Sequence, residues 1–300
     1  MKPGFRSDLI VEAHEALTTL GREAPGIQTK QRESHGCQIT EVQVVDSRGE
    51  EAVGRPQGRY ITVEIPRGVQ MEEEEETLCR LLAEELKQLV QVEPSQPVLV
   101  VGLGNRSVTP DAVGPQTMDR VLATRHLWQL APDSAQGLGC VCALQPGVMG
   151  NTGLESAEVI RGVVEQMQPA AVVVVDALAA RSVQRLGTTF QLCDTGIQPG
   201  SGVHNHRREL SQATLGRPVI GVGVPTVVDG LTLTLDILER AGHPAGEEEL
   251  NRALASEPPM MVTPKEVDGL VHRVSRLLSG GINLAFHPEL SLAEVDGLLG

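Results

Sequence analysis

Apolar residues gather in short runs in the middle of the chain. Three of these runs consist only of apolar residues and glycine: Val98–Val101, Ala171–Val175 and Val219–Val224. Strands that are apolar on both faces are typical of a buried parallel sheet. Stretches with the helical spacing of apolar residues lie between and after these runs: Gln116–Leu130, Leu154–Met167 and Leu231–Ala241. Their lengths suit right-handed crossover connections, so the pattern predicts one α/β unit.

The first third of the chain has a different pattern. Apolar and polar residues alternate in Ile39–Val45 and in Tyr60–Ile65, which favours half-exposed antiparallel strands. The segments between them, Ser47–Gly49 and Gly54–Gly58, contain residues typical of turns. The first eight residues show no periodicity, and helical spacing then follows in Glu12–Leu20. We therefore expect a short leader, a helix and a small antiparallel segment.

Two further helices have recognisable beginnings. Five consecutive glutamates, 72–76, precede a helical pattern that continues to Leu89, and their charges suit a helix N-terminus. Such a run is also typical of a solvated helix face. Near the C-terminus, Thr263–Glu266 reads as a capping box with Pro264 at the first helical position. This motif predicts a helix that begins there and continues through Leu277.

The composition agrees with an α/β fold. The chain has 300 residues, 40% of them apolar, which is enough to bury a full core. Only 2% of the residues are aromatic, so the core is expected to consist of aliphatic side chains packed between strands and helices. No internal repeat and no linker-like segment divides the chain, and we expect a single domain.

Charge and cysteine content narrow the class of protein. The formal net charge of −14 opposes binding to nucleic acid or to an anionic membrane surface. No apolar run approaches the roughly 20 residues needed to span a bilayer. The five cysteines form no C-x-x-C pair, and no signal segment precedes them. These features predict a cytosolic chain with reduced thiols.

Two aspartates follow apolar strands, where ligands gather in open α/β sheets. Asp176 comes directly after Ala171–Val175, and Asp111 lies in the loop after Val98–Val101. If the two carboxyl groups lie close together, one retains a proton and acts as an acid while the other activates water, which is a chemistry for peptide hydrolysis. A structural alternative stays open, in which Asp176 caps a helix and Asp111 stabilises a turn.

Other motifs give weaker indications. The third glycine of a dinucleotide-binding G-x-G-x-x-G motif would fall on Ser107, and no cofactor is predicted. His204 and His206 form the tightest histidine pair and suggest a surface loop, and Cys193 is interpreted as a buried structural thiol. Glycine-rich turns at 145–153 and 198–202 either expose backbone N–H groups to a substrate carbonyl or simply reverse the chain.

Several segments, in the same order along the chain, closely resemble the spore germination endopeptidases. They are Val101–Asn105, Ser107–Ala112, Thr124–Leu127, Pro146–Gly150, Val175–Ser182, Pro225–Asp229 and Met261–Asp268. The resemblance begins at Arg6 and runs nearly to His287, so it covers almost the whole chain.

The resemblance implies an endopeptidase that degrades small acid-soluble spore proteins in the cytoplasm of the forespore or spore core. This family is described as atypical aspartic peptidases without a cofactor, and Asp111 and Asp176 match its proposed catalytic pair. The implied fold resembles that of the hydrogenase-maturation peptidases, a three-layer, mostly parallel sheet flanked by helices. Members assemble as homotetramers, and neither direct nucleic-acid binding nor membrane association is expected.

The resemblance also implies a zymogen that removes its own leader. The matching bond is Asp8–Leu9, so residues 1–8 form the leader and residues 9–300 a single peptidase domain. A leader that imitates the substrate can occupy the cleft until it is cut, and protonation of Asp8 or of the catalytic pair is a possible trigger. Three departures from the family stand out: the leader is short, Gln198 replaces a histidine, and Gly242–Met260 is brief.

Two other functions remain open at this stage. One is a metal-dependent processing peptidase, in which Asp111, Asp176 and a histidine bind a divalent ion. The other is a noncatalytic carrier that shelters the acidic spore proteins in the same cleft. Sensitivity to a chelator distinguishes the first alternative, and retention of a spore protein without fragments distinguishes the second.

Overall fold

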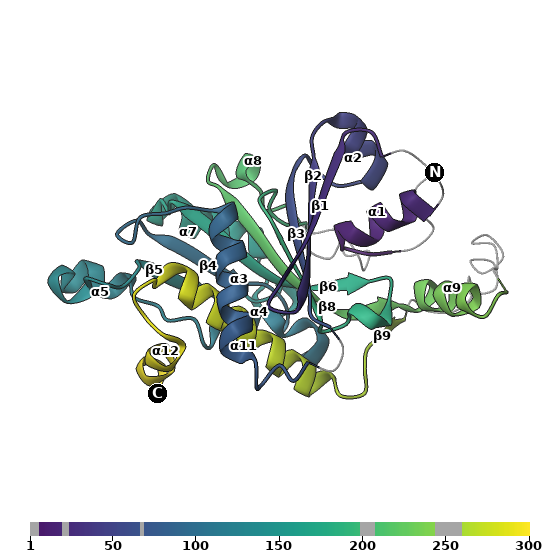
Figure 1. Ribbon diagram of the computed structural model, residues 1–300. Coiled ribbons are helices and arrows are strands. Elements are labelled where there is room, and N and C mark those ends of the chain that lie inside the picture. Colours follow the sequence, from purple (N-terminus) through teal and green to yellow (C-terminus); the bar gives the residue numbers. More distant parts are fainter. Residues whose placement is uncertain (1–5, 20–23, 67–68, 199–207, 244–259) are drawn as a thin grey trace.

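The computed structural model describes residues 6–19, 24–66, 69–198, 208–243 and 260–300, and its centre is one twisted sheet (Figure 1). The strands in spatial order are β1 (Ile27–Ser34), β2 (Cys37–Val44), β3 (Gly58–Glu64), β7 (Thr189–Cys193), β8 (Val219–Asp229), β6 (Ala171–Ala180), β4 (Val98–Gly102) and β5 (Val141–Leu144). A short strand, β9 (Met261–Val262), pairs with the end of β8.

The sheet is mixed, which corrects the expectation of a mostly parallel one. Among the described strands, only β5, β4, β6 and β8 are joined in parallel, and the other five pairings are antiparallel. A two-residue turn connects β1 to β2, and its residues His35 and Gly36 have φ values of 50° and 71°. Such turns join antiparallel strands directly, whereas a parallel pair needs a longer crossover.

Helices cover both faces of the parallel half, as a three-layer fold requires. Alternate residues of β4 and β6 enter separate apolar cores: Val98, Val100, Val173 and Val175 on one face, Leu99, Val101, Val172 and Val174 on the other. The first core is closed by α3 (Glu75–Leu89), α4 (Val113–Met118) and α11 (Val267–Phe286), and the second by α7 (Ser156–Met167) and α8 (Gln212–Leu215). This strict alternation explains why these strands are apolar at every position.

The helices α3 and α11 pack closely because α11 contains two consecutive glycines. A Cβ atom on Gly280 would lie 2.4 Å from Sγ of Cys79, and one on Gly281 would lie 2.9 Å from Cβ of Leu82. Cys79 is completely buried, and burial raises the pKa of its thiol to about 12. The glycines therefore bring the two helix backbones together around a neutral thiol. We call this region the α3–α11 layer.

Near the N-terminus, α1 (Ile10–Thr19) contacts β2, β3 and α2 (Ser47–Val53). The remaining elements are α5 (Arg125–Leu130), α6 (Met149–Thr152), α9 (Gly230–Arg240), α12 (Leu292–Leu299) and the short 3₁₀ turns η1 (Thr109–Asp111), η2 (Pro132–Ala135) and η3 (Val183–Arg185). Within the described ranges, no helix is both long and apolar enough to cross a membrane.

Two predicted elements differ from the structure. The helix expected at Gln116–Leu130 is interrupted between α4 and α5, because the backbone N–H of Leu122 donates to the side chain of Asn283 at 2.9 Å instead of continuing the helix. The turn expected at Ser47–Gly49 is the first turn of α2, because the side chain of Asp46 caps it and accepts from two backbone N–H groups. In both places a side chain takes the role of a backbone partner.

The prediction of a capping box at Thr263–Glu266 is also wrong. Helix α11 begins at Val267, and its N-cap residue Glu266 makes no side-chain capping bond. Instead Oγ1 of Thr263 donates to the carbonyl of Thr226 at 3.1 Å. Thr263 thus fixes the chain to β8 and lies three residues before the N-cap position. The shortened segment Gly242–Met260 lies mostly outside the described residues.

Candidate active site

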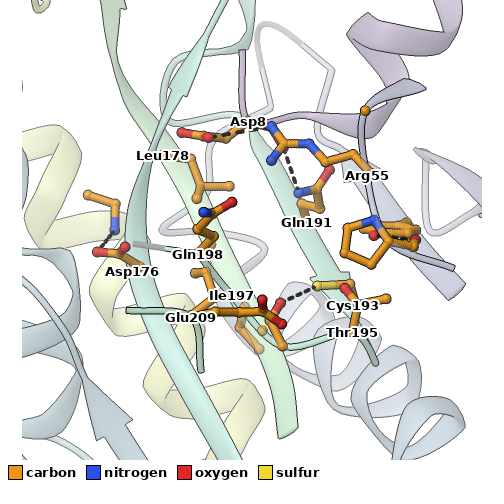
Figure 2. Close-up of a pocket in the computed structure, with 18 residues that line it drawn as sticks. Asp8, Arg55, Asp176, Leu178, Gln191, Cys193, Thr195, Ile197, Gln198 and Glu209 are labelled. Atoms are coloured by element: carbon orange, nitrogen blue, oxygen red, sulfur yellow. Dashed lines mark hydrogen bonds and ion pairs between the residues drawn. The ribbon is translucent and has the colours of Figure 1, made fainter. Parts of the chain in front are cut away.

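A cavity lies where the parallel and antiparallel halves of the sheet meet (Figure 2). It comprises about 750 Å³ of open space, part of it continuous with solvent. Its walls come from β6, β7 and β8, from the segment after α2 and from the loop after β7. Asp176 and Asp8 both line it. The cavity thus brings a candidate catalytic carboxylate and the bond expected to be processed into one space.

Asp176 lies in the middle of β6 and not at its end. The strand continues to Ala180 because its second half pairs with β8, with a bulge after Leu178. No helix follows Asp176 directly, so the helix-cap alternative for this residue is wrong. Its side chain is nearly buried, with 6% of the residue surface exposed, and its Oδ1 accepts from the backbone N–H of Ala177 at 2.9 Å.

Asp111 is the last residue of η1 and is partly exposed. Its Oδ2 accepts from the backbone N–H of Asn105 at 2.8 Å. Gly104 has a φ of 116°, and a Cβ atom there would lie 1.9 Å from the carbonyl oxygen of Asp111, so the loop requires glycine at this position. The turn-stabilising role expected as an alternative for Asp111 is therefore present.

The loop that carries Asp111 is fixed to the strands β6 and β8 near Asp176. The backbone N–H of Leu103 donates to the carbonyl of Val175 at 2.8 Å, and Oγ1 of Thr226 donates to the carbonyl of Pro110 at 2.7 Å. Asp176 in β6 and the loop of Asp111 thus both lie level with the carboxyl end of β4. Among the described residues that line the cavity, Asp176 is present and Asp111 is not.

The segment before α1 is bound along one wall of the cavity. The backbone N–H of Asp8 donates to the carbonyl of Ala179 at 2.8 Å, and the N–H of Ala179 donates to Oδ2 of Asp8 at 2.9 Å. The side chain of Gln191 donates to the carbonyl of Asp8 at 3.0 Å, and Arg55 donates to the carbonyl of Ser7 at 2.7 Å. Leu9, the next residue, is fully buried.

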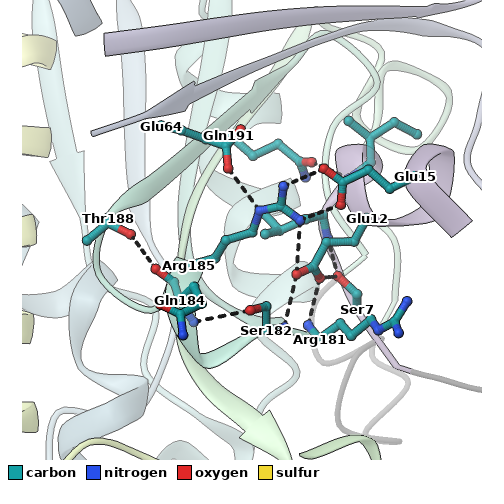
Figure 3. A network of polar contacts seen from close by, with 12 residues as sticks. Ser7, Glu12, Glu15, Glu64, Arg181, Ser182, Gln184, Arg185, Thr188 and Gln191 are labelled. Atoms are coloured by element: carbon teal, nitrogen blue, oxygen red, sulfur yellow. Dashed lines mark hydrogen bonds and ion pairs between the residues drawn. The ribbon is translucent and has the colours of Figure 1, made fainter. Parts of the chain in front are cut away.

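A second set of polar contacts holds the chain just beyond this bond (Figure 3). Glu12, with only 1% of its surface exposed, accepts from the backbone N–H groups of Arg181 at 2.6 Å and Ser182 at 3.0 Å. The guanidinium group of Arg185 lies 3.3 Å from Glu12 and 2.6 Å from Glu15, and it also pairs with Glu64 at 2.9 Å. We call Arg55, Ala179, Gln191 and Arg185 the leader cradle.

Arg6, the first residue that the structure describes, is held as well. The backbone N–H of Arg6 donates to Oγ1 of Thr232 at 3.1 Å, and its guanidinium group donates to Asp229 at 2.9 Å. Asp229 is buried and is the N-cap of α9, where it also accepts from the backbone N–H of Thr232 in the first turn. Residues 6 to 12 are therefore bound at both ends and at the bond between Asp8 and Leu9.

Sequence patterns do not identify the three long side chains of the leader cradle, Arg55, Gln191 and Arg185. Gln191 is a nearly buried amide between apolar residues of β7, and a polar residue inside an apolar strand was the signal that could have identified it. Arg55 was read only as part of a turn. It follows the left-handed Gly54, which ends α2 and directs the next residues toward the cavity.

The other residues that the sequence singled out as candidates are considered next. Cys193 is buried, its thiol donates to the carbonyl of Gly196 at 3.2 Å, and burial raises its pKa, which confirms the interpretation as a structural thiol. His204, His206 and most of the turn at 198–202 lie outside the described residues, and Gln198 lines the cavity. Within the described ranges, no three His, Cys, Asp or Glu side chains gather in a possible metal site.

Comparison with known proteins gives a consistent result. A family described as "Germination protease" matches residues 6–256. A germination protease of Caldanaerobacter subterraneus subsp. tengcongensis is 40% identical over 320 residues, covering 99% of this chain and 98% of the relative. One of Clostridium acetobutylicum is 41% identical over 321 residues, with 97% and 98% covered. One of Bacillus cytotoxicus is 39% identical over 351 residues, with 96% and 95% covered.

These similarities extend over nearly the full length of each protein. The alignment with the Bacillus cytotoxicus protein spans 351 positions, more than the 300 residues of this chain, so that relative has segments that are absent here. The matched region of the family includes the leader cradle and both candidate aspartates. The chain therefore belongs to the germination protease family and is an endopeptidase of spore germination.

Proposed function

We propose that this endopeptidase initiates the degradation of small acid-soluble spore proteins, with Asp111 and Asp176 as its catalytic carboxylates. We further propose that it first removes residues 1–8 by cutting its own Asp8–Leu9 bond. The observation that carries this proposal is the shared cavity of Asp8 and Asp176. A bond that is held in a fixed position beside a reactive carboxylate needs little further ordering before it reacts.

The chemistry requires only the two carboxyl groups and water. Close carboxyl groups do not both ionise readily, so one keeps a proton and the other acts as a base. The base takes a proton from water, whose oxygen adds to the carbonyl carbon of the bond. The acid protonates the departing nitrogen as the C–N bond breaks. The products are one new carboxyl group and one new amine, and atoms and charges balance.

The leader indicates which substrates fit. It has an acidic residue before the bond and the apolar residues Leu9, Ile10 and Val11 after it. Once the bond is cut, residues 1–8 can leave, whereas Leu9 and Ile10 are buried in the core of the domain. The position that Asp8 vacates then becomes available to an acidic residue of a protein substrate. This order of events accounts for a leader that imitates the substrate.

The remaining parts of the proposal rest on family membership. They are a peptidase domain of residues 9–300, a homotetramer, a location in the forespore or spore core, and a fold related to the hydrogenase-maturation peptidases. A mixed sheet with helices on both faces agrees with the coarse features of that fold. Neither a cofactor nor direct contact with nucleic acid enters the proposed reaction.

The test uses the purified full chain, incubated with a small acid-soluble spore protein, and mass spectrometry of the fragments. We expect cuts after acidic residues and a new N-terminus at Leu9 in the wild type. Asp111→Asn and Asp176→Asn are each expected to slow both reactions by at least about 100-fold, because each removes an acid or a base. Asp119→Asn is a matched control, since Asp119 lies near the same loop but pairs with Arg106 on the surface.

Three outcomes contradict parts of this proposal. Full activity of Asp111→Asn or of Asp176→Asn excludes the residue from the catalytic pair. Inhibition by a chelator, reversed by a divalent metal, favours the metal-dependent alternative. Retention of an intact spore protein by the wild type, without fragments, favours the carrier.

A further inference from the structure

A single side chain contacts the backbone on both sides of Leu9, the residue after the bond that is expected to be cut. Nε2 of Gln191 donates to the carbonyl oxygen of Asp8 at 3.0 Å, and Oε1 of the same amide accepts from the backbone N–H of Ile10 at 2.7 Å. The primary amide of a glutamine offers a donor and an acceptor side by side at any pH. Gln191 therefore holds the backbone before and after Leu9 and, with it, the carbonyl of the Asp8–Leu9 bond.

Gln191 and Asp176 lie in the same row of the sheet. In β8, Gly223 is the partner of Gln191 on one side and of Asp176 on the other. Residues in one row direct their side chains to the same face, and two strand spacings separate these two by about 10 Å between Cα atoms. The residue between them has no side chain of its own, and Leu178 packs over it instead. The amide and the carboxylate thus approach the cavity from opposite sides (Figure 2).

The carboxylate of Asp8 occupies a site that suits an acidic side chain. Only 12% of the side-chain surface of Asp8 is exposed, so its charge requires partners. Its Oδ2 accepts from the backbone N–H of Ala179 at 2.9 Å, and its Oδ1 lies 3.5 Å from the guanidinium group of Arg55. Arg55 also donates to the carbonyl of Ser7, one residue earlier, at 2.7 Å. One cation therefore binds both the backbone and the acidic side chain of the leader.

From these contacts we propose that Arg55 is the residue that selects an acidic side chain before the cut bond, and that Gln191 holds and polarises the carbonyl of that bond. This inference rests on the proposed cutting of Asp8–Leu9. When water adds to the carbonyl carbon, negative charge develops on the oxygen that Gln191 already contacts. A donor in place before the reaction stabilises this charge without reorganisation.

The same two residues are available to a protein substrate. Departure of residues 1–8 frees the guanidinium group of Arg55 and the N–H groups of Ala179 and Gln191 from the contacts they make with Ser7 and Asp8. An acidic residue of a spore protein regains all of these contacts in the position of Asp8. The predicted preference for acidic residues therefore arises from Arg55, a side chain outside the parallel half of the sheet.

The role of Arg55 is tested with four full-length chains: the wild type, Asp8→Asn, Arg55→Gln and the double variant. The rate of cutting after residue 8 is followed by mass spectrometry. With Arg55 present, Asp8→Asn is expected to slow cutting by about tenfold, the size of one charge-assisted contact. With Gln at position 55, the same change is expected to alter the rate less than about twofold. Arg59→Gln is the control, because Arg59 pairs with Glu41 on the neighbouring strand.

The role of Gln191 is tested with Gln191→Met and Gln191→Glu. The first variant has neither donor nor acceptor, and its rate is expected to fall by about 10²- to 10³-fold. The second regains a donor only when its carboxyl group is protonated, so its rate relative to the wild type is expected to rise as pH falls. The rate of Gln191→Met relative to the wild type is expected to stay constant with pH. Gln43→Met, in the exposed part of β2, is the control.

The outcomes separate this inference from the proposed function. If the wild type cuts neither its leader nor a spore protein, the peptidase mechanism and the two assigned roles are overturned together. If the wild type cuts but Asp8→Asn has the same effect with and without Arg55, only the selecting role of Arg55 is overturned. If the cutting rate of Gln191→Glu, divided by that of the wild type, does not change with pH, as is expected for Gln191→Met, then Gln191 has a merely structural role. Circular dichroism spectra identify any variant that does not fold.

Discussion

The leader cradle and the α3–α11 layer each hold a segment of the chain in place, but with opposite chemistry. In the leader cradle, charged and amide side chains bind a short extended segment through hydrogen bonds. In the α3–α11 layer, glycines and a neutral thiol allow two helices to meet through packing alone. Polar contacts can be exchanged for those of another peptide, whereas close packing is specific to the shapes that fill it.

This difference indicates where function and stability reside. In the proposed mechanism, the leader leaves after one bond is cut and is replaced by a substrate of similar chemistry, and polar groups serve that purpose. Helices that never separate have no such requirement. Changes in the leader cradle are therefore expected to affect cutting and the attachment of α1, and changes in the α3–α11 layer to affect only the free energy of unfolding.

The largest effect on stability is expected from Glu12→Gln. It removes the buried charge that faces Arg185 and places an amide N–H₂ toward the N–H groups of Arg181 or Ser182. We expect a loss of about 2–4 kcal/mol in the free energy of unfolding, measured by urea denaturation. Glu15→Gln is the matched control, because Glu15 pairs with the same arginine but is 54% exposed. A loss of similar size in both variants would show that burial does not govern this network.

A smaller effect is expected from Gly280→Ala in the α3–α11 layer. The added methyl group would lie 2.4 Å from Sγ of Cys79, so the helices must separate or the thiol must move. We expect a loss of about 1–3 kcal/mol, and recovery of part of it in the double variant with Cys79→Ala. The rate of cutting per folded molecule should not change. A selective loss of cutting would mean that this layer and the cavity are coupled.

The smallest effect is expected from His287, at the end of α11. It is completely buried; Nδ1 accepts from the backbone N–H of Gly139 at 3.0 Å, and Nε2 donates to the carbonyl of Leu122 at 3.0 Å. Only the neutral ring can make both bonds, and burial lowers its pKa below the ordinary value of 6.5. The unfolded chain therefore binds the proton more readily than the folded one.

The sign of the pH effect follows from that difference. The contribution of His287 is present above about pH 6.5 and is lost as the pH falls from there toward the lowered pKa of the folded protein, by at most about 1.4 kcal/mol per pH unit. Urea denaturation at pH 7.5 and pH 5.5 measures this loss, which His287→Gln should reduce. His272→Gln, on the exposed face of the same helix, should not reduce it.

Local patterns predicted much of the fold. The apolar runs became β4, β6 and β8, and the helical spacing became α1, α3, α7 and α9, with ends shifted by a few residues. Strand β1 was missed because six of its eight residues are exposed and no apolar pattern marks it. It exists because β2 offers a complete set of backbone partners. A strand formed in this way depends on its neighbour and not on its own side chains.

In the candidate site, too, some features follow from the local sequence and others only from the tertiary structure. The sequence by itself determined that Asp176 and Asp111 come after buried apolar runs, because run length is a local property of the chain, although strand β6 continues beyond Asp176. Only the tertiary structure decided that Gln191 faces the bond after Asp8, 183 positions away, and that Arg55 lies beside the same residue. Hydrogen bonds act over about 3 Å in space, whatever the separation along the chain. The order of strands therefore selects which distant residues meet, and that order comes from the packing of the whole sheet.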